Sequence, residues 1–380
     1  MPSSASRTAR TCLVVTLVCL GALFPLGAAS GTARGSSVLA GPRSTQAQVA
    51  NATVAAAGAG WIARDLRSSG ALIDAESLQP SAGDTANAIL ALVAAGYGAN
   101  QVRTATTWLE HNYASYVSSN GTDSAGRLAL VILAGAAAGA RPSQFGGTAA
   151  SDNLVARLEA TEQMTGASAG AFGTGLAVNA FYQSLALLAL AAVKKLGKGT
   201  KLGETFLAQL QCTDGGWEYS RADATTACVT PNPKNVASPD TNTTAVADQA
   251  IVATGGHFTH NPVTFFADSQ ETNGSFGVYG VSGEGQTGDP DSTGYVIQAL
   301  IALRALNDKI FVRGGTTPEE ALARFQYGCK APVSERGEFA YYGKPSQLAT
   351  LQAVPAAAGV ALPVTSRKLS VAEPRLSCAS

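Results

Sequence analysis

Residues 203–217 read GETFLAQLQCTDGGW, and residues 238–253 read SPDTNTTAVADQAIVA. The first stretch is an apolar helical run that ends at Gln211 and passes into the glycine turn before Trp217. After a polar loop, the second stretch begins with Asp, Asn and Thr, which are favoured at helix N-termini, and continues as another helical run. Helix, glycine–aromatic turn, polar loop and capped helix together form the unit that the rest of the chain repeats.

Twelve helical runs of two alternating kinds can be read along the chain. Six are amphipathic and cover residues 54–66, 101–113, 152–163, 202–211, 262–270 and 318–327. Six are apolar nearly all round and cover residues 84–95, 123–138, 179–193, 242–253, 291–306 and 346–360. A helix that is apolar on every side is buried on every side, and repeated helix pairs are typical of closed or stacked arrays. We therefore predict an all-α fold, a single (α/α)6 toroid over residues 50–360 with six inner and six outer helices.

The composition and the two ends of the chain suggest an exported protein. The 380 residues carry no formal net charge and only 14% are charged, so we expect no nucleic-acid partner. Two arginines, an apolar run over residues 12–26 and small residues at 27–29 predict a secretory signal peptide at residues 1–29, cleaved near Ala29. Residues 30–49 are expected to be a disordered linker and residues 361–380 a C-terminal tail.

The cysteines point to disulfides rather than to thiol or metal chemistry. Cleavage of the signal peptide would leave Cys212, Cys228, Cys329 and Cys378, an even number in an exported chain. Four cysteines allow three pairings. Cys212–Cys228 closes one loop and is favoured, with Cys329–Cys378 attaching the tail. No Cys-x-x-Cys pair is present, and no metal site is predicted.

A candidate ligand site follows from how the inner helices begin. Each is expected to start at short polar residues, namely Asp84-Thr85, Asp123-Ser124, Asn179, Asn242-Thr243, Asp291-Ser292 and Ser346. Helix capping is the simpler explanation for each of them alone. Inner helices of a toroid all run the same way, however, so the caps would ring one mouth among aromatic loops, as in a small-molecule pocket. The candidate ligand-binding residues are Trp217, Tyr219, Asp240, Asn242, Phe276, Tyr279, Asp289, Asp291, Tyr341 and Tyr342. Trp217 and Phe276 are expected to be packing residues more often than the tyrosines.

The repeat unit resembles a known motif. Gly203, Phe206, Leu207, Gln211, Gly215 and Trp217 match the Gln-Trp repeat of squalene and oxidosqualene cyclases. Over roughly residues 50–360 the chain resembles the α/α-toroid superfamily, which includes terpene cyclases, protein prenyltransferases, complement-type thioester domains and cobalamin carriers. Class II terpene cyclases protonate an alkene with the middle acid of Asp-x-Asp-Asp-Thr-Ala. Residues 289–294 read DPDSTG, so the resemblance implies Asp291 as general acid, with Ser292 in place of the third aspartate.

Within the superfamily, the cobalamin carriers transcobalamin and intrinsic factor share the most general features with this chain. They are secreted, disulfide-bonded and built on one toroid. That resemblance implies a non-catalytic protein that holds an apolar or corrinoid-like ligand, with a bound corrinoid as cofactor and a second protein or a membrane transporter as partner. Residues 361–380 are too few for the small C-terminal domain that completes the ligand site in those carriers. The zinc ligands of prenyltransferases and the thioester motif have no counterpart in the sequence.

The leading expectation is therefore a secreted small-molecule-binding protein. The alternatives are a terpene-cyclase-like or prenyltransferase-like enzyme with Asp291 as general acid, and a structural or protein-interaction toroid.

Overall fold

The computed structural model describes residues 45–380 except 67–68, 175–178, 222–223, 231, 233–234, 236, 283–287, 373, 375, 377 and 379–380. The expected signal peptide and most of the expected linker lie outside these residues. All described elements belong to one compact unit, residues 39–380. In this part of the chain, no helix combines the length and the apolar character needed to cross a membrane.

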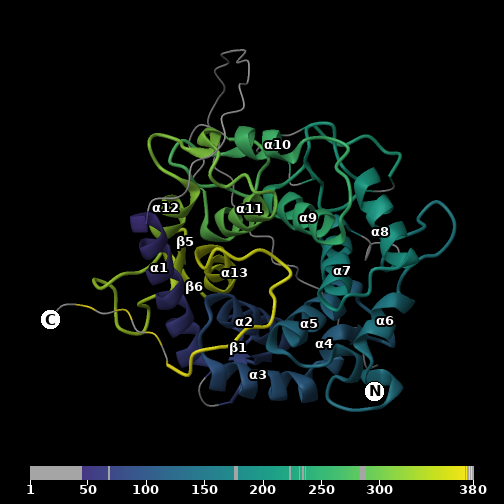
Figure 1. Cartoon of the computed structure of the whole chain (residues 1–380), viewed down its shortest axis with the longest axis horizontal. Coiled ribbons are helices and arrows are strands. Elements are labelled where there is room, and N and C mark those ends of the chain that lie inside the picture. The colour runs from purple at the N-terminus through teal and green to yellow at the C-terminus, as the bar shows by residue number, and fades with distance from the viewer. Residues whose placement is uncertain are drawn as a thin grey trace, which may run out of the picture. The chain divides into compact units, whose positions relative to one another are not determined.

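Six apolar helices form a closed ring. They are α2 (Ala82–Ala95), α5 (Ala125–Ala138), α7 (Ala180–Ala192), α9 (Thr241–Thr254), α11 (Pro290–Ala302) and α13 (Gln347–Ala357). Each contacts the next in this order, and α13 contacts α2 (Figure 1). Small residues let the helices approach closely: a Cβ at Gly294 of α11 would lie 3.1 Å from the carbonyl oxygen of Gln352 in α13. The hydrophobic core lies in and around this ring.

Six further helices pack against the ring from outside. They are α1 (Thr45–Asp65), α3 (Ala99–Asn112), α6 (Leu154–Ala160), α8 (Lys198–Gln209), α10 (Pro262–Ser269) and α12 (Pro318–Ala323). Each contacts one or two ring helices, and α1 lies against both α2 and α13. The all-α prediction is thereby confirmed. One helix was not predicted, the short α4 (Ala114–Val117).

The remaining described elements are short. Three antiparallel hairpins lead into ring helices: β1–β2 (Leu72–Ile73 and Pro80–Ser81), β3–β4 (Ser118–Ser119 and Thr122–Asp123) and β5–β6 (Phe339–Tyr341 and Lys344–Ser346). Their registers pair Leu72 with Ser81, Ser118 with Asp123, and Phe339 with Ser346. The 3-10 helices are Pro142–Gln144, Ala150–Asp152 and Lys309–Phe311.

The repeated glutamine connects one outer helix to the start of the next by side-chain hydrogen bonds. Gln211 follows α8, and its Nε2 donates to the carbonyl oxygens of Gly215 (3.0 Å) and of His260 (2.9 Å), which lies just before α10. The same double contact is made by Gln270 to Gly274 and Phe311, and by Gln326 to Gly337 and Val54. This contact also explains why α12 is shorter than the predicted 318–327: the chain leaves the helix before Gln326 so that the side chain can reach the turn.

A second repeated contact holds the large apolar residue that follows each glycine turn. The backbone N–H of Trp217 donates to Oγ1 of Thr244 (2.9 Å), in the first turns of α9. The equivalent pairs are Leu72 with Thr85, Phe276 with Thr293, and Phe339 with Thr350. For Phe172 the acceptor of the backbone N–H is Oε1 of Gln183. The contact fixes each turn against the ring helix that follows it.

Two disulfides and a tail complete the unit. Cys212–Cys228 and Cys329–Cys378 are both present, as favoured from the sequence. The tail crosses the C-terminal side of the ring helices (Figure 1). The N–H of Leu362 donates to Oε1 of Gln249 in α9 (2.7 Å), and the N–H of Ser370 donates to the carbonyl oxygen of Gly96 at the end of α2 (2.9 Å).

Candidate functional site

The N-caps of the ring helices differ from the predicted ones in three places. The observed caps are Ser81, Ser124, Asn179, Asp240, Asp289 and Ser346. Asp84, Asn242 and Asp291 are therefore not caps but lie inside the first turn. Where two short polar residues stand close together, the sequence pattern does not distinguish which one accepts the first free N–H groups. The side chains of Asn242 and Asp291 therefore have no capping role.

Asp289 and Asp291 form a carboxyl pair at the start of α11. Oδ1 of Asp289 accepts from the N–H of Ser292 (2.7 Å), and Oδ2 accepts from the Ser292 hydroxyl (3.0 Å). Oδ1 of Asp291 is buried and has no hydrogen-bond partner among the described residues. Burial raises the pKa of both carboxyls, and it raises the pKa of Asp291 to about 6.

The pair therefore keeps a proton at a pH at which an exposed aspartate has lost it. Both Ser292 donors and the helix N-terminus stabilise the ionised form of Asp289. The charge of Asp291 also raises the pKa of Asp289, so the two carboxyls share this proton. The arrangement is that of a buried carboxylic acid next to a charged carboxylate.

Two tyrosines lie near this acid. Tyr295 follows Asp291 by one helical turn, and burial together with the charge of Asp291 raises its pKa. Tyr341, on β5, has its pKa raised by burial and by the charges of Asp289 and Asp291. Tyr342 packs edge-on against Tyr341 with ring centroids 4.5 Å apart and is 69% exposed. Asp291 thus has one tyrosine on the ring side and another on the loop side.

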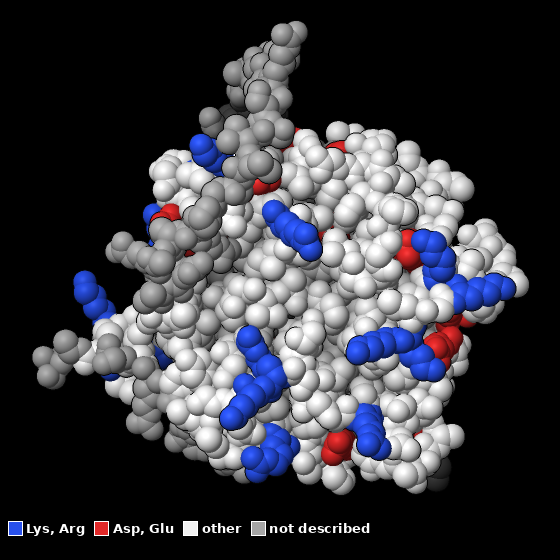
Figure 2. All heavy atoms as spheres, in the orientation of Figure 1, with Lys and Arg blue, Asp and Glu red and all other residues white. Residues whose placement is uncertain are grey.

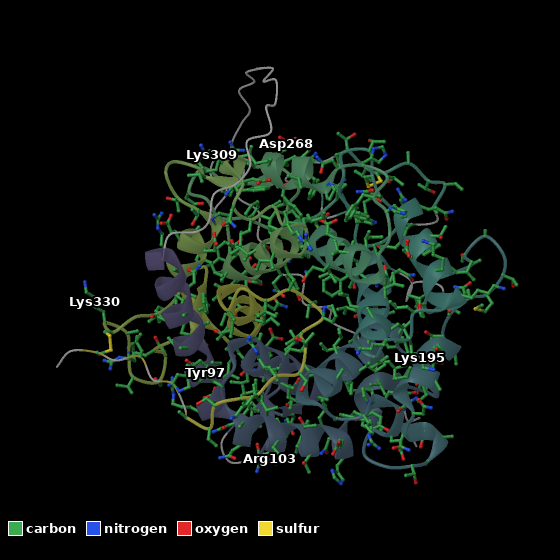
Figure 3. The ribbon with its side chains drawn as sticks, viewed as in Figure 1. Tyr97, Arg103, Lys195, Asp268, Lys309 and Lys330 are labelled. Atoms are coloured by element: carbon green, nitrogen blue, oxygen red, sulfur yellow. A yellow bond between two sulfur atoms is a disulfide. The ribbon has the colours of Figure 1, made fainter. Side chains whose placement is uncertain are left out.

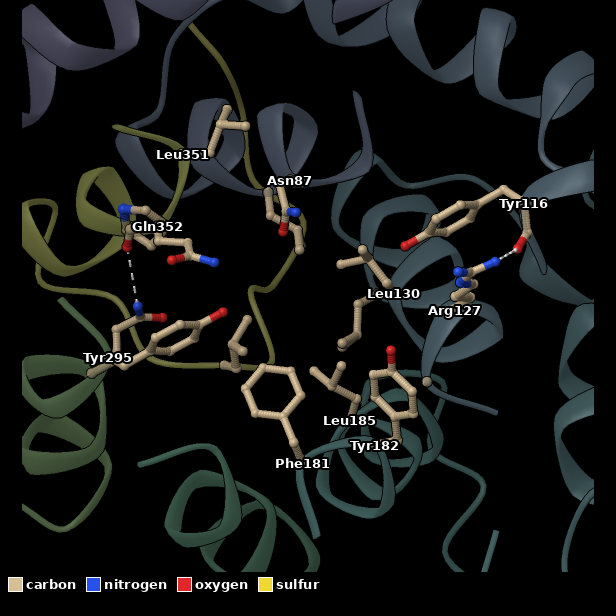
Figure 4. Close-up of a pocket in the computed structure, with 16 residues that line it drawn as sticks. Asn87, Tyr116, Arg127, Leu130, Phe181, Tyr182, Leu185, Tyr295, Leu351 and Gln352 are labelled. Carbon is tan, nitrogen blue, oxygen red and sulfur yellow. Dashed lines mark hydrogen bonds between the residues drawn. The ribbon is translucent and has the colours of Figure 1, made fainter. Parts of the chain in front are cut away.

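A cavity of about 180 Å³ lies inside the ring (Figure 4). Its lining comes from α2, α5, α7, α11 and α13, together with Tyr116 of α4 and Leu362 of the tail. Most of it is leucine and aromatic surface, and its polar groups include Asn87, Arg127 and Gln298. Tyr295 lines the cavity, whereas Asp291 lies one turn of α11 away from it.

Aromatic contacts connect Tyr219 to this cavity. The Phe181 ring lies 6.1 Å from that of Tyr295 and 6.4 Å from that of Tyr219. Tyr219 also lies 6.5 Å from Tyr182. Phe181, Tyr182 and Tyr295 line the cavity, so Tyr219 packs against its wall from outside.

The other candidate residues are spread over different surroundings. Trp217 and Phe276 are fully buried in the core, and Nε1 of Trp217 donates to the carbonyl oxygen of Leu207 (2.9 Å). Asp240 caps α9, forms isolated β-bridges with Trp217 and Tyr279, and has its pKa raised to about 6 by burial. Of the ten candidates, the structure therefore gathers Asp289, Asp291, Tyr341 and Tyr342 in one place, with Tyr219 at the cavity wall.

The residues that line the cavity itself were not predicted from the sequence; they include Arg127, Phe181, Tyr182, Tyr295 and Gln298. A signal was present, because Asp291, Tyr295 and Gln298 are spaced four and three residues apart on one face of a helix whose other residues are apolar after Thr293. Polar and aromatic residues at that spacing on a buried helix indicate a side that faces an internal space.

Two further features bear on what the described surface can bind. Cys212, Glu218 and Cys228 have ligand atoms within 4.8 Å of one another, but the two cysteines are joined in a disulfide and cannot ligate a metal as thiolates. On the face shown in Figure 2, most of the surface is uncharged, and lysine and arginine side chains are scattered over it, several of them beside an aspartate or glutamate.

Comparison with protein-family models finds no match, and neither does comparison with curated proteins. Solved structures with a similar arrangement include "ent-Copalyl diphosphate synthase from Streptomyces platensis", at a TM-score of 0.43 and 17% identity over 74% of this chain. The matched region spans 51% of that protein. Another is "Candida albicans protein geranylgeranyltransferase-I complexed with GGPP", at a TM-score of 0.42 and 10% identity, covering 71% of this chain and 82% of that one. These matches are too distant to assign the chain to a family, so what the site can do follows from its own residues.

Proposed function

We propose that the chain is a terpene-cyclase-like enzyme on an (α/α)6 toroid, in which Asp291 protonates a carbon–carbon double bond of an apolar substrate that extends from the central cavity toward the start of α11. The observation that carries the proposal is the buried oxygen of Asp291, which has no partner among the described residues and belongs to a carboxyl whose pKa is raised to about 6. The resemblance of residues 289–294 to the cyclase motif Asp-x-Asp-Asp-Thr-Ala supports the same role.

The chemistry needs an acid, an apolar space and a way to stabilise positive charge. The π electrons of the double bond form a new C–H bond with the proton of Asp291, leaving a cation on the neighbouring carbon. The aromatic rings of Phe181, Tyr182 and Tyr295 line the cavity and would stabilise that cation. Attack by a second double bond closes a ring, and loss of a proton to water gives a cyclic isomer of the substrate. Water then restores the proton of Asp291.

Ser292 stands where the cyclase motif has its third aspartate. Its hydroxyl donates to Oδ2 of Asp289 (3.0 Å) and so helps to hold that carboxyl in its charged form. Under this proposal Asp289 keeps the proton on Asp291, because a second charge beside an existing carboxylate is unfavourable.

The test uses acyclic polyprenes of increasing length and mass-spectrometric detection of cyclic products with unchanged mass. The full chain is expected to produce them, and Asp291→Asn is expected to abolish them. Asp268→Asn is the matched control, since Asp268 lies exposed on α10 at the periphery (Figure 3). Absence of cyclic products from every polyprene, or full turnover by Asp291→Asn, would refute the proposal.

A secreted carrier is the second candidate. The observation in its favour is that the cavity is mostly apolar and that no described residue donates a hydrogen bond to the buried oxygen of Asp291 to orient it. A volume of about 180 Å³ is below the 300–1,000 Å³ of sites for drug-sized ligands, so a corrinoid would have to bind outside the cavity. Native mass spectrometry of protein from the culture medium distinguishes the two: a retained ligand without turnover supports the carrier. Export and a protein or transporter partner remain predictions.

A further inference from the structure

Arg127 brings a positive charge into the apolar cavity. It lies on α5, and no other lysine or arginine among the described residues lines this space. Its neighbours along the wall are leucines and aromatic residues. Arg127 is half-buried, and a cation in such surroundings loses part of its hydration, so its partners indicate whether it is a structural residue or a binding residue.

The described protein gives Arg127 few partners. Its Nη1 donates to the carbonyl oxygen of Tyr116 (3.2 Å), and the guanidinium lies 5.2 Å from the centre of the Tyr116 ring. No described carboxylate lies within ion-pair distance, and Nε and Nη2 donate to no described group. Arg157, by contrast, makes two hydrogen bonds to the carboxylate of Asp123, at 2.6 and 2.9 Å.

The free side of this guanidinium is suited to one kind of ligand group. A guanidinium presents its N–H groups in a planar fork that matches a carboxylate, and such charge-assisted pairs are strong where water is scarce. The Tyr116 ring and carbonyl support the cation but do not neutralise it. In Figure 4 the hydroxyl groups of Tyr116 and Tyr182 lie at the same side of the cavity as Arg127. These hydroxyls are two further donors for an anionic group.

We propose that Arg127 binds the carboxylate of an amphipathic substrate, so that the enzyme acts on an unsaturated carboxylic acid rather than on a neutral hydrocarbon. A carboxylate is favoured over a diphosphate because one described cation lines the cavity, which balances a single negative charge. The inference rests on the proposed function, since it takes the central cavity as the substrate site.

This assignment also orients the substrate. Arg127 and Tyr295 lie on opposite sides of the cavity (Figure 4), and Tyr295 is the cavity residue one turn from Asp291. The carboxylate would therefore lie at the α5 side and the chain would extend toward α11. The double bond that Asp291 protonates is then one far from the acid group.

The test compares three probes with the same chain and different head groups: geranic acid, geraniol and geranylamine. Binding to the full chain at neutral pH is measured by titration calorimetry. Geranic acid is expected to bind at least about tenfold more tightly than geraniol, and geranylamine more weakly than both, as expected for one charge-assisted pair. In Arg127→Gln the preference for the acid is expected to disappear, and in Arg127→Lys to be retained in part. Arg103→Gln is the control, because Arg103 lies on α3 at the periphery, where it donates to Asn100 (Figure 3).

Equal binding of the three probes, an acid preference that survives in Arg127→Gln, or no binding at all would overturn the assignment. So would tighter binding of geranyl diphosphate than of geranic acid. The outcome is separable from that of the proposed function. Acid-selective binding without cyclic products would reject the cyclase and keep Arg127 as the anion site. Cyclisation of neutral polyprenes without acid preference would support the cyclase and reject Arg127 as the anion site.

Discussion

Asp248 occupies a position that the other ring helices fill with an aliphatic side chain. In every ring helix, the residue eight positions after the N-cap is fully buried. In the other five helices this residue is Ile89, Ile132, Leu187, Ile297 or Val354. Neither carboxyl oxygen of Asp248 has a hydrogen-bond partner among the described residues. Burial raises its pKa well above the usual value of an aspartate. The carboxyl is therefore held in its neutral form by the core around it.

Replacing this carboxyl should stabilise the protein at neutral pH. Because the pKa is raised in the folded state, the folded chain keeps a proton that the unfolded chain loses as pH rises above about 4, so stability falls with rising pH. We expect Asp248→Val to increase the free energy of unfolding by about 1–3 kcal/mol at neutral pH and to flatten its pH dependence. Thermal unfolding of both proteins at acidic and neutral pH checks this, and a less stable variant at neutral pH would contradict it.

The rate of cyclisation should depend on pH through the protonation of Asp291. An acid that delivers a proton must be protonated, and burial raises its pKa to about 6. The rate of cyclisation is therefore expected to be level at low pH and to fall about tenfold per pH unit above that value. Initial rates over a pH series test the expectation, with Asp268→Asn as a control that should keep the same profile. A rate that rises from pH 6 to 8 would show that a base, not this acid, limits the reaction.

At the scale of the elements, the repeat contacts depend on single hydrogen-bonding side chains. Thr293 accepts the buried N–H of Phe276 (3.0 Å). Thr293→Val keeps the shape and removes the acceptor, so we expect a loss of about 1–3 kcal/mol in the free energy of unfolding. Chemical denaturation measures it. Thr272→Val is the control, because Thr272 is exposed. An equal loss in the free energy of unfolding for Thr272→Val would show that the buried hydrogen bond of Thr293 does not stabilise the fold.

These contacts also show how far the sequence determines the elements. The spacing of Gln211, Gly215 and Trp217 predicted a repeated turn, and the structure gives its physical basis in two hydrogen bonds of one glutamine. The bounds of α12 and the choice of Asp289 as cap were not predictable, because they depend on which backbone groups meet after packing. Cavity residues such as Arg127 were missed for the same reason, since the direction of a buried helix face is set by its neighbours.

At the scale of the whole molecule, the ring closes through segments far apart in the sequence. Nε1 of Trp61 in α1 donates to the carbonyl oxygen of Ser334 (3.0 Å), and Gln326 reaches Val54. The tail adds a covalent connection to the segment that follows α12, since Cys378 is bonded to Cys329 across 49 residues. This disulfide constrains the unfolded chain more than Cys212–Cys228, which spans 16 residues.

Removing the two disulfides should therefore have unequal effects. From loop length alone, the pair Cys329→Ser and Cys378→Ser should cost about 4 kcal/mol and the pair Cys212→Ser and Cys228→Ser about 3 kcal/mol. Denaturant titration of both double variants checks the order. The reverse order would mean that strain or residual structure, rather than loop length, sets these costs.

Loss of Cys329–Cys378 should also release only the end of the tail. Leu362 stays bonded to Gln249, and Ser370 stays paired with Gly96, whether or not the disulfide is present. Limited proteolysis of the Cys329→Ser and Cys378→Ser double variant should therefore cut after Ser370 and leave Leu362 in the cavity wall. Ligand binding should then be unchanged in the cut protein. Cleavage before Leu362, or loss of binding after cleavage beyond Ser370, would show that the disulfide itself holds the tail across the ring and so keeps the cavity closed.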